Sequence, residues 1–129
     1  MYFLLFNSFG EKFDSLAFSK NISHPNIRIF QKGDRMHAPK MFHKEPGISI
    51  LLEDSADSDQ ATSTIINFTK TNHSWLKKLA SHPVRSAFNI GITVGGDDFS
   101  PCLTLDAGFV IILSQLRIGI NINCYPSSD

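Results

Sequence analysis

The fold is decided by residues 88–125, which read FNIGITVGGDDFSPCLTLDAGFVIILSQLRIGININCY. Apolar residues alternate with polar or small ones over 88–94 and again over 118–124, the period of a strand with one buried face. Between them, apolar residues recur at helical spacing over 105–116, and Thr104 is the expected N-cap of that helix. The stretch therefore predicts a strand, a turn, a helix and a second strand in succession.

Weaker signals of the same kind extend this order to the rest of the chain. The expected elements are strands at 2–8, 27–30 and 48–53 and helices at 13–20 and 58–82. Ser58 is the expected N-cap of the longer helix. That segment forms either one kinked helix or two, because the run 69–74 is poor in helix formers. Trp75 shares the apolar helical register and is expected in the core.

Single strands and hairpins separated by helices favour an antiparallel sheet with helices on one side. We therefore expect one α+β domain over residues 1–129. It should contain a single layer of mainly antiparallel sheet, of about five strands, with helices packed chiefly on one face. Residues 35–46 are predicted to form a long hairpin loop, and whether this loop is ordered alone is left open.

Composition excludes several classes of function. The hydrophobic fraction of 42% and the charged fraction of 19% are ordinary for a soluble globular domain. Twelve basic and twelve acidic residues cancel, so no bulk field attracts nucleic acid or an anionic membrane. The apolar start at 1–6 lacks the basic leader of a signal peptide and is interpreted as a strand. No apolar run reaches membrane-spanning length, so we expect a cytoplasmic protein.

The residues that bind metals or cofactors do not form a recognisable set. The two cysteines indicate no disulfide framework, with Cys124 expected in the core and Cys102 in a loop. None of the five histidines shows the i, i+4 spacing of a helical zinc site, and Cys-x-x-Cys is absent. No cofactor is therefore expected.

The turn Gly95-Gly96-Asp97-Asp98 is the one motif that suggests catalysis. It is similar to the glycine–acid turns that hold divalent metals in nucleotide cyclases and polymerases. The chain has no glycine-rich loop followed by lysine to bind the phosphates of a nucleotide. The favoured interpretation is a solvated turn in which the glycines supply positive φ, with Asp97 and Asp98 as metal ligands in the alternative.

Two surfaces are predicted to bind a partner. If the helices cover the isoleucines of the two last strands, the opposite sheet face presents amide and hydroxyl side chains beside a few large apolar groups. The first and third strands add Phe3, Leu5 and Leu51 to this face. The loop after residue 30 is basic with an interleaved aromatic, which favours a specific protein interface over a nucleic-acid groove. The expected contact residues are Asn89, Thr93, Asn121, Asn123 and Glu53 on the sheet, and Lys32, Asp34, Arg35, Lys40, Phe42 and Lys44 on the loop.

A series of short motifs, in this order along the chain, resembles the bacterial domain of unknown function 4279 family. The motifs are Phe13-Asp14, the turn Phe30-Gln31-Lys32-Gly33-Asp34, Asp98-Phe99-Ser100-Pro101, Leu103-Thr104-Leu105, 113–119, and Ile120-Asn121-Ile122-Asn123-Cys124-Tyr125. The resemblance implies a bacterial protein, but the family has no agreed activity and supplies no catalytic residues. Small α+β proteins of this type are often immunity proteins, an analogy at the level of the fold alone.

These observations predict a non-enzymatic protein-binding domain. The most concrete form is an immunity-type inhibitor that occludes a partner toxin or enzyme by shape and charge. One alternative is a small metal- or ligand-dependent enzyme that uses the turn 95–98. Another is a homodimeric structural protein whose open sheet face is the dimer interface.

Overall fold

The computed structural model describes residues 1–36, 41–94 and 102–126. These residues form five strands and four helices. In chain order they are β1 (Tyr2–Phe9), α1 (Ser15–Ser19), β2 (Ile27–Phe30), β3 (Gly47–Leu51), α2 (Ser58–Thr71), α3 (His73–Leu79), β4 (Arg85–Val94), α4 (Ala107–Gln115) and β5 (Ile118–Pro126).

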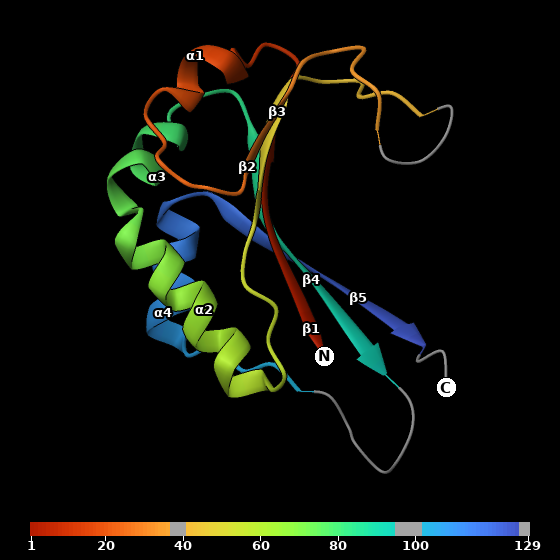
Figure 1. Ribbon diagram of the computed structural model, residues 1–129. Helices are drawn as coiled ribbons and strands as arrows, with labels where there is room; N and C mark the ends of the chain where they lie inside the picture. Colours follow the sequence, from red (N-terminus) through yellow and green to blue (C-terminus); the bar gives the residue numbers. More distant parts are fainter. Residues whose placement is uncertain (37–40, 95–101, 127–129) are drawn as a thin grey trace.

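The strands form one open sheet in the order β2-β3-β1-β4-β5. Neighbouring strands are antiparallel except β4 and β5, which are parallel and are connected through α4. The four helices of the described residues all lie on one side of the sheet, and these residues place no helix on the other side (Figure 1). The predicted α+β class, with a mainly antiparallel sheet and helices on one face, is confirmed.

Alternation along the central strand β1 divides the sheet into two faces. Tyr2, Leu4 and Phe6 are fully buried on the face toward the helices, whereas Phe3 is partly exposed on the other. Because paired residues share a face, the registers Phe6↔Phe88 and Phe3↔Gly91 carry this division into β4. The face turned away from the helices is called the open face below.

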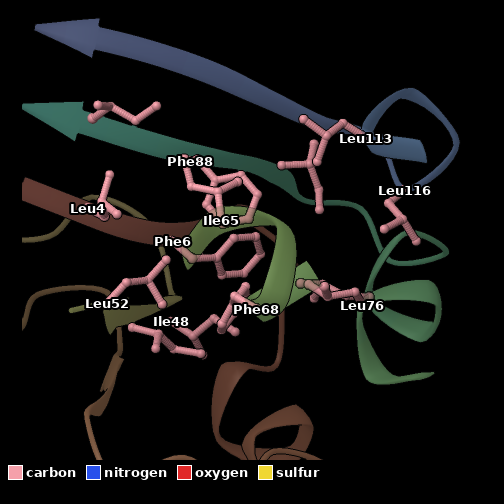
Figure 2. Packing of buried hydrophobic residues seen from close by; sticks show 14 of the residues in the cluster. Leu4, Phe6, Ile48, Leu52, Ile65, Phe68, Leu76, Phe88, Leu113 and Leu116 are labelled. Carbon is pink, nitrogen blue, oxygen red and sulfur yellow. The ribbon is translucent and has the colours of Figure 1, made fainter. Parts of the chain in front are cut away.

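An aromatic cluster around Phe6 joins the sheet to the helices. The Phe6 ring lies 5.5 Å from Phe68 of α2, 5.9 Å from Trp75 of α3 and 5.4 Å from Phe88 of β4, measured between centroids. Figure 2 shows Phe6 enclosed by Phe68, Phe88 and aliphatic side chains from both layers. The edge-on and tilted ring geometries are those that aromatic pairs prefer. The prediction that Trp75 belongs to the core is confirmed.

Residue 72 settles whether the segment 58–82 is one helix or two. The helices α2 and α3 are separate, and Asn72 lies between them. Its side-chain amide donates to the Phe68 carbonyl oxygen at 2.8 Å, and its Oδ1 accepts from the Trp75 indole N–H at 2.8 Å. The asparagine therefore bonds both to the end of α2 and to the first turn of α3, which favours a break at this position.

Three expectations at the level of single residues were wrong. Asp57, not Ser58, caps α2, and Asp106, not Thr104, caps α4. Each aspartate accepts from a backbone N–H three residues on, at 2.8 Å, and also places a negative charge at the helix N-terminus. Cys124 is exposed rather than in the core, because the distal part of β5 runs beyond the helices (Figure 1).

Both cysteines are free and exposed. Within the described ranges, no helix combines the length and the apolar character needed to cross a membrane.

Because one face of β1 is buried and the other is exposed, two similar substitutions should lower the free energy of unfolding by different amounts. Phe6→Ala removes a ring buried among three others and should lower the free energy of unfolding by about 3–5 kcal/mol. Phe3→Ala, on the open face of the same strand, should cost less than about 1.5 kcal/mol because Phe3 is 38% exposed. Urea denaturation of both variants measures the difference, and equal losses would contradict the assignment of the faces.

Candidate functional site

The open face carries a shallow groove of about 400 Å³ across β1, β4 and β5. Its floor and walls mix apolar side chains with two amides and two hydroxyls. The lining residues are Phe3, Leu5, Asn89, Gly91, Thr93, Asn123 and Tyr125. Three of the predicted contact residues, Asn89, Thr93 and Asn123, are therefore brought together with the predicted apolar residues Phe3 and Leu5.

The groove exists because a glycine occupies the middle of β4. Gly91 pairs with Phe3 on one side and with Asn123 on the other. A Cβ atom placed at Gly91 would lie 3.2 Å from the Cε2 atom of Tyr125 and 3.6 Å from the Cβ of Phe3. A larger residue at this position would fill the space between the two rings. Glycine inside a strand often marks a site where another group approaches closely.

Amide side chains form the polar part of the open face. Asn89 and Asn121 are directly opposite in the parallel register, and Asn121 Nδ2 donates to Asn89 Oδ1 at 3.1 Å. An asparagine side chain carries two N–H donors and a carbonyl oxygen that accepts two hydrogen bonds. This single bond therefore leaves donors and acceptors on both amides, and Asn123 adds a third amide in the groove. Such a surface can bind a polypeptide backbone as well as polar side chains.

Two other predicted sheet residues are placed differently. The Thr93 hydroxyl lies at one end of the groove and donates to the Met1 carbonyl oxygen at 3.3 Å, so it is partly engaged within the chain. Glu53 follows β3, which ends at Leu51, and it is not among the residues that line the groove. It lines a separate depression of about 510 Å³ between the sheet edge and α2. Glu53 therefore lines a different depression from Asn89 and Asn123, and its role in binding a partner stays a prediction.

Hydrogen bonds join the predicted hairpin loop to the turn 31–34 that precedes it. Gly33 N–H donates to the His43 carbonyl oxygen and His43 N–H donates to the Asp34 carbonyl oxygen, both at 2.8 Å. Asp34 Oδ2 also accepts from Gln31 N–H at 2.8 Å, and Gly33 has a φ of 92°. Asp34 thus builds the turn with its carboxylate, and glycine supplies the left-handed backbone that the turn needs.

A stack of three rings holds this loop against the open face. His43 stacks on Phe30 with centroids 3.9 Å apart, and Phe9 lies 6.2 Å from Phe30 and 6.1 Å from His43. Gly47 pairs with both Phe9 and Phe30 and has no room for a Cβ because the Phe9 ring lies over it. The loop therefore lies on the side of the sheet opposite the helices (Figure 1). Both predicted binding surfaces are on the same side of the molecule.

The basic residues of the loop lie beside acidic ones. Lys32 and Lys44 line a depression of about 440 Å³ that also contains the ion pair between Arg85 and Glu45. The hydrogen bond and the charge of Glu45 raise the pKa of Arg85 above its ordinary value. Carboxylates at 11 and 45 and arginines at 85 and 117 give this depression mixed charge. Basic side chains outnumber acidic ones in this depression, so it favours contact with acidic groups.

The other loop residues of the predicted set are exposed where the structure describes them. Phe42 is 53% exposed and Arg35 is exposed, and their backbones pair as an isolated bridge. Lys40, Asp97 and Asp98 lie outside the described residues. Over 1–36, 41–94 and 102–126, no cluster of three or more His, Cys, Asp or Glu side chains is placed to hold a metal ion.

Sequence reasoning missed Gly91 and Tyr125 as parts of the site. Gly91 was counted only as a small residue within an alternating strand, although a glycine there signals close approach of another group. Tyr125 continues the register of Asn121 and Asn123, so its place on the open face followed from the same alternation.

No family model, no curated protein and no solved structure matches this chain. The resemblance to the domain of unknown function 4279 family therefore stays a prediction. The functional argument rests on the geometry of the open face and the loop.

The ring stack predicts that Phe30→Ala loosens the loop. Loss of the Phe30 ring removes the contact beneath His43, so the amides of Gly33 and His43 should exchange with deuterium at least about tenfold faster. Phe42→Ala, an exposed aromatic in the same loop, is the matched control and should leave both rates unchanged. Equal acceleration in both variants would show that the stack does not hold the loop.

Proposed function

We propose that this chain is a non-enzymatic, cytoplasmic binding protein of the immunity type, which inhibits a partner toxin or enzyme by occluding its active site. The observation that carries the proposal is the open face, on which the described residues place no helix (Figure 1). The groove between Phe3 and Tyr125 lies on this face. Soluble domains usually cover a sheet face that exposes several large apolar side chains.

The composition of this surface fits a protein partner. Interface centres are enriched in aromatic residues placed in well-packed depressions, surrounded by polar groups that exclude water. Here Phe3 and Tyr125 flank the depression, Asn89 and Asn123 supply hydrogen bonds, and exposed Phe42 stands on the neighbouring loop. We infer a partner that inserts an apolar side chain into the groove.

The loop adds the electrostatic part of the proposal. Lys32, Arg35 and Lys44 are exposed on the open-face side and would favour acidic groups on the partner. Charges at the edge of an interface raise the association rate and select the partner more than they raise affinity. An inhibitor that blocks an active site needs rapid association and specificity of this kind.

Valine substitutions at two glycines, one inside the groove and one outside it, test the proposal directly. Gly91→Val fills the groove without adding charge, and valine is well suited to a strand. Capture of the partner from lysate by the tagged variant should fall at least about tenfold, the loss expected when a central contact is blocked. Capture is measured by quantitative mass spectrometry of the co-purifying proteins.

Gly119→Val is the matched control, because Gly119 lies on the same face in β5, outside the groove, and its new Cβ would meet only the Ser86 carbonyl oxygen at 3.8 Å. It should capture the partner like the unmodified chain. The purified partner should then lose its activity in proportion to added protein until the two are equimolar. A partner that binds both variants equally, or that stays fully active when saturated, would refute the proposal.

A further inference from the structure

The outer edge of β5 is a long row of backbone groups without a strand partner among the described residues. β5 spans nine residues and pairs only with β4. From Asn121 to Pro126 every residue is exposed, and Ile122 and Tyr125 are 52% and 53% exposed. An edge of this length is a template for pairing with another strand.

β5 also lacks the features that normally protect an edge. Its residues, IGININCYP, include no charged side chain, and its single proline stands at the last position. The opposite edge, β2, is only four residues long and carries Arg28. Natural sheets block pairing at an edge with short strands, lysines or other charges. Within the part of the chain that the structure describes, the β5 edge therefore lacks such protection over its length.

The helix that precedes β5 also lacks charged residues. α4 has the sequence AGFVIILSQ, again without a charged residue, and it contacts β5. Phe109 and Leu113 are buried, yet Val110 and Ile111 on its other side are 48% and 58% exposed. Adjacent exposed aliphatic side chains on a helix without charged residues favour contact with a partner. A neighbouring uncharged edge and uncharged helix therefore both point to a covering partner.

We propose that a second copy of this chain pairs with β5, edge to edge and antiparallel, to form a symmetric dimer. The strand is complementary to itself, because isoleucine and asparagine alternate from Ile120 to Asn123. When the two-fold axis, perpendicular to the sheet, passes between the two copies of Ile122, Ile122 opposes Ile122 and Asn121 opposes Asn123. Zero net charge gives the two copies no long-range repulsion.

This arrangement keeps the helices of both copies on one side of a continuous sheet. Each α4 helix then lies on the same side of this continuous sheet, in contact with its own β5. The open faces of both copies remain uncovered on the other side. The dimer is thus independent of the proposed inhibitor function and differs from a dimer formed through the open face.

The test measures mass by light scattering over a range of concentrations. The unmodified chain should approach twice 14.4 kDa as its concentration rises. Ile122→Lys and Ile122→Glu should each weaken association at least about tenfold, because like charges then face each other across the two-fold axis. An equimolar mixture of the two variants should regain the dimer, since lysine now opposes glutamate.

Two controls locate the contact. Leu16→Lys alters an apolar residue of α1, 53% exposed, on a helix that packs against β2 and β3 at the other edge, and should leave the dimer intact. Phe3→Lys, on the open face, should also leave it intact. A chain that stays at 14.4 kDa at every concentration would overturn the proposal. The proposal would also be overturned if the Ile122→Lys variant still formed the dimer, or if the Phe3→Lys variant did not.

Discussion

Burial of one face of β1 is the constraint on which the rest of the structure depends. β1 is the central strand, and its helix-facing side chains from Tyr2 to Phe6 are completely buried. Each such side chain contributes about 1.5–3 kcal/mol when it leaves water, so a one-residue slip of register would expose the whole set. The aromatic cluster at Phe6 then fixes α2, α3 and β4 relative to β1.

The same alternation creates the open face, which is the surface proposed to bind a partner. Every residue that β1 commits to the core is followed by one that faces the other way, so Phe3 and Leu5 reach the open face because Tyr2, Leu4 and Phe6 do not. Gly91 in the paired strand then leaves the space beside Phe3 unfilled. The core and the groove are thus two consequences of one strand pattern.

Period-two and helical spacing predicted the layers of this fold correctly, because strands and helices with one buried face show those periods directly. Helix starts were missed by one or two residues at Ser58 and Thr104, since serine, threonine and aspartate all cap helices and only the folded geometry selects one. Cys124 was misplaced for a different reason. Alternation gives the face of a residue but not where a strand ends or how far the helices extend over it.

The candidate site was predictable in part. The asparagines of β4 and β5 were placed together because both strands alternate in register, and the loop was recognised by its charges. Its attachment to the open-face side was not predictable, because it depends on a ring stack between Phe9, Phe30 and His43, which are distant in sequence. The groove itself depends on a missing side chain, which leaves no mark in a hydrophobic pattern.

The most direct test of the central claim, that the open face is the binding surface, is an NMR titration of the labelled chain with its captured partner. The side-chain amides of Asn89, Asn121 and Asn123 are separate reporters on that face. Their signals should shift or broaden in proportion to bound partner, while those of Asn67 and Asn72 in the helical layer stay in place. Shifts confined to the helical asparagines would contradict the account.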